Sequence, residues 1–102
     1  MLLHTVMWRF IDAEGKTKNE NRAIVKEGLL SLPSTVKELL KIEFFENVVD
    51  CERNFDAMLK VYVEDAEALE RYKVHPAHQK VASYVKKVTD NRAAVDIFVD
   101  SL

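Results

Sequence analysis

The chain has 102 residues, a length typical of one globular domain, and we expect residues 1–102 to form a single domain. Its net charge is −2 and its basic residues are scattered, which argues against the basic stripe of a nucleic-acid-binding surface. No apolar run reaches membrane-spanning length, the first residues lack the basic start of a signal peptide, and the single cysteine, Cys51, cannot form an internal disulfide. These features predict a cytoplasmic protein that contacts neither nucleic acid nor a membrane.

The first segment, Leu2–Ile11, is rich in residues that favour β-strands. His4 shares one face of this strand with Val6, Trp8 and Phe10, because side chains alternate along a strand with a period of two. The opposite face is also apolar, so we expect the strand to be covered on both sides.

A helix follows, capped by the side-chain oxygen of Thr17 or Asn19 and running to about Leu32. Its apolar stripe has helical spacing and consists of Ile24, Val25, Gly28, Leu29 and Leu32. Pro33 is expected to stop this helix, and residues 34–39 are expected to add a short helical turn.

Three further strands are expected, at residues 41–48, 55–63 and 92–99. A charged turn over residues 50–54 joins the first two of them. The last strand is apolar on both faces, like the first.

The segment between the last two strands predicts a broken helix. Asp65 is a suitable cap for a helix over residues 66–73. His75 precedes Pro76 and is therefore disfavoured in helical conformation, whereas Pro76 suits the first position of a new helix. We expect that second helix to end near Val88.

This order of elements, βαββαβ, predicts an α+β ferredoxin-like fold, with a four-stranded antiparallel sheet and helices on one face. The helices leave the other face open, and there a monomer would expose Leu3, Met7, Val95 and Ile97. A patch of this kind is larger than soluble monomers usually tolerate, so we expect a symmetric homodimer.

His78 is the first candidate for chemistry, because it lies at the N-terminal end of the expected apolar stripe Val81, Ala82, Val85 and Val88. Burial and the helix dipole both favour a neutral imidazole, which can act as a general base. The alternative is a core histidine whose ring is satisfied by a backbone carbonyl.

Tyr72 and His4 are further candidates. The break at His75 and Pro76 could bring the Tyr72 hydroxyl near His78, where it could bind a substrate oxygen or orient the base. His4 could be the polar member of an apolar pocket. The alternatives are an aromatic core residue and a histidine at the surface.

We expect no metal and no cofactor. His75 and His78 have the H-x-x-H spacing of two ligands, but His75 precedes the helix and no carboxylate or cysteine completes a set. The sequence also lacks the glycine-rich and nucleophile motifs that bind phosphates or mark hydrolases.

The chain resembles the stress-responsive A/B barrel domain family, a branch of the dimeric α+β barrel superfamily. The resemblance rests on His4-Thr5-Val6, on the Y-x-x-H-P-x-H segment Tyr72–His78, and on Val95-Asp96. It implies a dimeric α+β barrel. In a plant polyketide cyclase of this family, the matching tyrosine and second histidine carry out an intramolecular aldol reaction.

Carried over, the resemblance makes His78 the general base and Tyr72 the group that steadies the carbonyl or the base. It also implies a ligand pocket lined by His4, Val6, Trp8, Ile24, Val25, Leu29, Ala57, Leu59, His75, Val81 and Ala94. The cyclase has a histidine where this chain has Ala57, a less bulky residue at the position of Trp8, and larger apolar groups at Thr89 and Arg92. The pocket is therefore expected to be smaller or more polar.

Two hypotheses follow. The first is a homodimer of unassigned activity with a small hydrophobic ligand pocket between sheet and helices. The second is a cofactor-independent cyclase or lyase that abstracts a proton next to a carbonyl, with His78 as base and Tyr72 as its partner.

Overall fold

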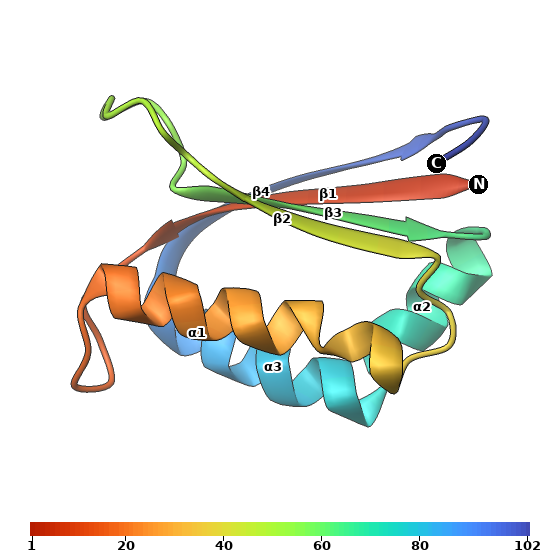
Figure 1. Cartoon of the computed structure of the whole chain (residues 1–102), viewed down its shortest axis with the longest axis horizontal. Coiled ribbons are helices and arrows are strands. Elements are labelled where there is room, and N and C mark those ends of the chain that lie inside the picture. The colour runs from red at the N-terminus through yellow and green to blue at the C-terminus, as the bar shows by residue number, and fades with distance from the viewer.

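The computed structural model describes all residues from 1 to 102. A single sheet is covered on one face by α1 and α3, which lie side by side, while α2 sits at one end (Figure 1). The elements are β1 Leu2–Phe10, α1 Lys18–Leu30, a 3₁₀ helix Leu32–Ser34, β2 Lys41–Glu46, β3 Ala57–Val63, α2 Ala66–Val74, α3 Pro76–Val88 and β4 Thr89–Phe98.

The strands are antiparallel in the order β2-β3-β1-β4, so β1 and β3 are central and β2 and β4 are edges. This is the predicted ferredoxin-like fold, and the helices cover one face as expected. None of the helices is both long and apolar enough to cross a membrane.

The start of α1 follows the prediction and its end does not. Thr17 and Glu20 form a reciprocal capping box, in which each side chain accepts from the other residue's backbone N–H. The helix ends at Leu30, two residues before the predicted end, and the extra turn spans Leu32–Ser34 rather than residues 34–39. Pro33 lies inside that turn, because a residue without an N–H fits an N-terminal position but cannot continue α1.

The predicted break between α2 and α3 is confirmed. Asp65 caps α2 by accepting from the backbone N–H of Ala68 at 2.8 Å. His75 then caps α3, since its Nδ1 accepts from the N–H of Ala77 at 3.1 Å, and Pro76 occupies the first turn.

The strand ends differ from the predicted ones. β2 ends at Glu46 rather than residue 48, and β3 begins at Ala57 rather than residue 55, because the connecting loop leaves the sheet and projects beyond its open face (Figure 1). β4 begins at Thr89, directly after α3, three residues before the predicted start. It is an edge strand and is mostly exposed within a single chain.

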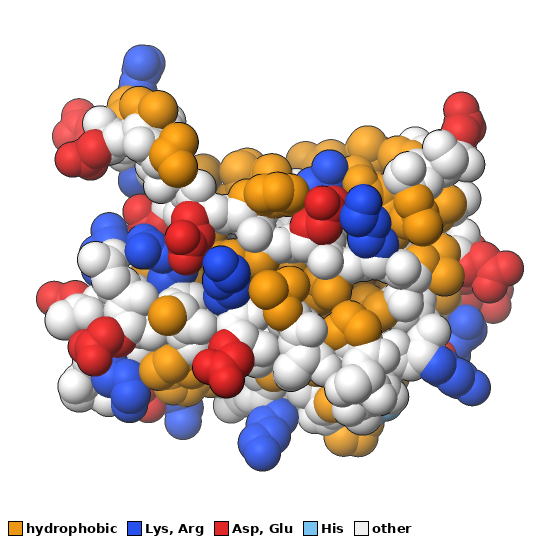
Figure 2. All heavy atoms as spheres, in the orientation of Figure 1, with side chains coloured by type: hydrophobic (Ala, Val, Ile, Leu, Met, Phe, Trp, Pro, Cys, Tyr) orange, Lys and Arg blue, Asp and Glu red, His pale blue; other side chains and the backbone are white.

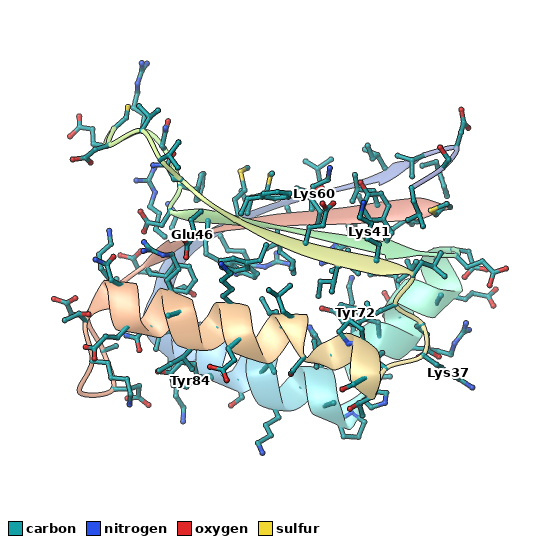
Figure 3. The ribbon with its side chains drawn as sticks, in the orientation of Figure 1. Lys37, Lys41, Glu46, Lys60, Tyr72 and Tyr84 are labelled. Atoms are coloured by element: carbon teal, nitrogen blue, oxygen red, sulfur yellow. The ribbon has the colours of Figure 1, made fainter.

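One buried polar side chain was not predicted. Asn21 of α1 is fully buried, and its amide donates to the carbonyl oxygens of Ile11 and Ala13. Its side-chain oxygen accepts from the Tyr84 hydroxyl of α3 at 2.6 Å. Asn21 therefore ties both covering helices to the end of β1, and Figure 3 shows Tyr84 in the helical layer, away from the sheet.

The open face carries three cross-strand rows that follow from the strand register. The rows are Phe45–Met58–Met7–Ala93, Glu43–Lys60–Thr5–Val95 and Lys41–Tyr62–Leu3–Ile97. Val95 is 61% exposed and Ile97 46% exposed, as predicted for a monomer. The prediction was wrong for Leu3, which is only 8% exposed because it lies between Tyr62 and Ile97. Figure 2 shows hydrophobic side chains along this side of the molecule, interrupted by a few charges.

Candidate functional site

A pocket of about 940 Å³ lies between the sheet and α3. Its lining residues are His4, Val6, Trp8, Leu29, Leu59, Tyr72, Lys73, His78, Gln79, Ala82, Ser83, Val85, Lys86, Lys87, Thr89 and Arg92. This volume is in the range of sites that hold small organic molecules.

Tyr72 brings an unusual polar group to this pocket. Its side chain is 1% exposed, and its hydroxyl has no hydrogen-bond partner in the protein. Figure 3 shows Tyr72 in the layer between sheet and helices, near α2. Burial raises the pKa of this phenol, so the hydroxyl keeps its proton. An unpaired buried hydroxyl destabilises a fold by about 1–3 kcal/mol, and a ligand acceptor would remove that penalty.

The surroundings of His78 determine which of its two ring nitrogens carries the proton. Its Nδ1 lies 3.0 Å from the carbonyl oxygen of Lys73, which can only accept, so Nδ1 carries the proton. Nε2 is then the basic nitrogen. Burial lowers the pKa of His78, and the hydrogen bond to Lys73 opposes this shift in part. The imidazole is therefore neutral at pH 7, the state that a general base requires.

Tyr72 and His78 are neighbours, with ring centroids 4.4 Å apart and planes inclined by 50°. The two residues come from different helices, and the break at His75 brings those helices together. His75 caps α3 with its own ring nitrogen and does not line the pocket.

A second polar pair lies at the same end of the pocket. His4 of β1 faces Asp96 of β4 in the register, and Nδ1 of His4 lies 2.5 Å from a carboxylate oxygen of Asp96. The carboxylate accepts from Nδ1, so it fixes the orientation of the His4 ring. This pair could not be predicted from the sequence pattern, since it depends on the pairing of strands at opposite ends of the chain.

The structure contains no group of three or more histidine, cysteine, aspartate or glutamate side chains placed to hold a metal ion.

A sequence model of the stress responsive A/B barrel domain matches residues 2–99. The chain belongs to this family.

Proteins similar to this A/B barrel domain include one related sequence and solved structures of the same fold. An uncharacterised protein of Streptomyces coelicolor is 33% identical over 79 residues, which span 78% of this chain and 80% of that protein. A dimeric ferredoxin-like protein of unknown function from Thermobifida fusca superposes with a TM-score of 0.81 at 19% identity, over 96% of this chain and 90% of that one. A hydroxynitrile lyase from Passiflora edulis has the same TM-score, 0.81, at 8% identity, over 99% and 94%.

Several residues that the sequence assigned to the pocket of this A/B barrel domain line it, and others lie outside. His4, Val6, Trp8, Leu29 and Leu59 join Tyr72 and His78 in the lining. Ile24, Val25 and Val81 instead border a groove between α1 and α3, Ala57 borders the β2–β3 loop, and Ala94 and His75 line none of these cavities.

The displacement of Val81 reflects a small rotation of α3 that a helical pattern does not resolve. Val81 was expected to face the pocket, but it packs against Gly28, where an added Cβ would lie 3.4 Å from the Val81 methyl groups. Ala82 lines the pocket in place of Val81. The sequence also missed the polar side of α3, namely Gln79, Ser83, Lys86 and Lys87.

Proposed function

We propose that this A/B barrel domain is a homodimer in which each protomer binds a small hydrophobic molecule that contains a carbonyl group. The observation that carries the proposal is the Tyr72 hydroxyl, which is buried, protonated and unpaired beside the neutral ring of His78. A carbonyl oxygen is an acceptor of the right kind for that hydroxyl. The apolar walls of the pocket, from Val6, Leu59 and Val85, would bury the rest of the molecule.

The homodimer is supported by the open face of the sheet. Its exposed apolar residues, such as Val95 and Ile97, lie where a second sheet would cover them. The related protein of Thermobifida fusca is dimeric. Sedimentation tests this part, and a monomer at micromolar concentration would contradict it.

A second candidate function is cofactor-independent catalysis, and the assigned tautomer of His78 favours it. Because Nδ1 donates to the carbonyl of Lys73, Nε2 has the free electron pair that could accept a proton from the carbon next to a carbonyl. The Tyr72 hydroxyl would then donate to the oxygen as negative charge develops on it. The Passiflora edulis lyase is an enzyme with this fold, which makes the fold compatible with such chemistry.

Binding of 2-decanone, a neutral medium-chain ketone, tests the first function by calorimetry. We expect binding to the wild type and weakening of about fivefold to tenfold in Tyr72→Phe, the effect of losing one hydrogen bond of about 1 kcal/mol. n-Decane, the matched control ligand, should bind both proteins equally. Equal binding of the ketone to both proteins would overturn the role of Tyr72.

Exchange of the α-protons of the same ketone with deuterium, followed by NMR in D₂O, tests catalysis. The wild type should accelerate exchange, and His78→Gln should abolish the acceleration while still binding the ketone. Glutamine is a suitable replacement because its amide can donate to the Lys73 carbonyl without supplying a base. No acceleration by the wild type would exclude this activity for simple ketones.

A further inference from the structure

The charged side chains that line the pocket are all basic. Four lining residues are basic, namely Lys73, Lys86, Lys87 and Arg92, and none is acidic. The chain as a whole has more acidic than basic residues, with a net charge of −2, so composition does not account for this imbalance.

Two of these four charges are uncompensated. Lys73 lies 3.6 Å from a carboxylate oxygen of Glu70, and Lys87 lies 3.8 Å from one of Glu14. Lys86 and Arg92 have no ion-pair partner, and neither side chain donates a hydrogen bond within the protein. An arginine and a lysine that converge on one cavity without a protein anion favour an anionic group of the ligand.

The uncompensated charges lie at the end of the pocket opposite Tyr72 and His78. Lys86 follows His78 by eight residues on α3, which corresponds to about 12 Å along the helix. On the sheet side, β1 places Trp8 opposite Arg92 and His4 opposite Asp96. These two pairs are four residues apart, or about 13 Å along the strand.

The region between the two ends is apolar, with Val6, Leu29, Leu59 and Val85 in the lining. Asp96 adds negative charge at the His78 end, where it holds His4. An anionic group is therefore repelled from that end and attracted to the end with Lys86 and Arg92.

We propose that the ligand is an amphipathic keto acid, whose carboxylate binds Lys86 and Arg92 while its ketone oxygen reaches Tyr72 and His78. An apolar spacer of medium length joins the two groups. This inference rests on the proposed function, because it takes the carbonyl at the Tyr72 end as given.

The test compares 9-oxodecanoate with 2-decanone by calorimetry. The two molecules share the methyl ketone and the chain, and differ only in a carboxylate in place of the terminal methyl group. We expect the wild type to bind the keto acid about tenfold more tightly at low salt, and added salt to reduce this preference.

The double variant Lys86→Gln/Arg92→Gln should lose the preference for the keto acid and bind 2-decanone like the wild type, which shows that it is folded. Lys80→Gln is the matched control, since Lys80 is on the same helix but borders the groove between α1 and α3. It should keep the preference. A wild type that binds both molecules equally, or a control that loses as much as the double variant, would overturn this inference alone. If neither molecule binds, the proposed function fails with it.

Discussion

The two faces of the sheet differ in which of their side chains lack a partner. The covered face has a packed core, but its pocket holds a buried hydroxyl without a partner and a neutral histidine with a free ring nitrogen. The open face has an ion pair between Lys41 and Glu43 but leaves large apolar side chains in water. The unpaired hydroxyl supports the proposed ligand, whereas the exposed apolar side chains support the proposed dimer.

The largest expected effect tests whether stability resides in the covered face. Leu59 is buried among the core residues, so Leu59→Ala should lower the free energy of unfolding by about 2–5 kcal/mol. Its neighbour Met58 points to the open face, and Met58→Ala should cost far less in the monomer. Urea denaturation of both variants at equal protein concentration measures the difference. Equal losses would mean that the covered face contributes no more to stability than the open face.

The second prediction concerns assembly. Val95→Lys places a cation in the central row of the open face, where burial against a second copy would remove it from water. We expect the dimer to weaken at least about a hundredfold, measured by analytical ultracentrifugation. Val74→Lys is the control, because Val74 is a comparably exposed valine at the end of α2. Dissociation of both variants, or of neither, would place the interface elsewhere.

The third prediction separates stability from binding in the pocket. Tyr72→Phe removes a buried hydroxyl that has no partner, so the free protein should be unchanged or more stable, by up to about 2 kcal/mol. Thermal unfolding measures this effect. A clear loss of stability would mean that the hydroxyl has a partner in solution, and the free donor assigned to the pocket would not exist.

The smallest effect is a pH dependence. His78 has a lowered pKa when folded and an ordinary value near 6.5 when unfolded, so the unfolded chain binds more protons between the two values. Stability should be complete above about pH 6.5 and fall as the pH drops below it. Since the chain has two other histidines, the measurement is the difference between the wild type and His78→Gln. A parallel loss in both proteins would assign the dependence to the other histidines.

The sequence predicted those features that depend on local chemistry. Thr17, Asp65 and Pro76 mark helix starts that the structure confirms, because caps and prolines act within one turn. The predicted end of α1 was wrong by two residues, since its stripe continues through Leu32 although the helix does not.

Features that depend on contacts between distant parts of the chain were harder to predict from the sequence. The pairing of His4 with Asp96 requires the register of β1 and β4, and the exchange of Val81 for Ala82 requires the rotation of α3 against Gly28. The basic end of the pocket was also hard to predict, because it brings together Arg92 of β4 and Lys86 of α3.

The most direct test of the central claim is the ¹³C NMR shift of a carbonyl-labelled ketone bound to the pocket. A hydrogen bond from the Tyr72 hydroxyl draws electron density from the carbonyl carbon. We expect a downfield shift on binding to the wild type and a smaller shift with Tyr72→Phe. Equal shifts in the two bound proteins, or no binding to the wild type, would contradict it.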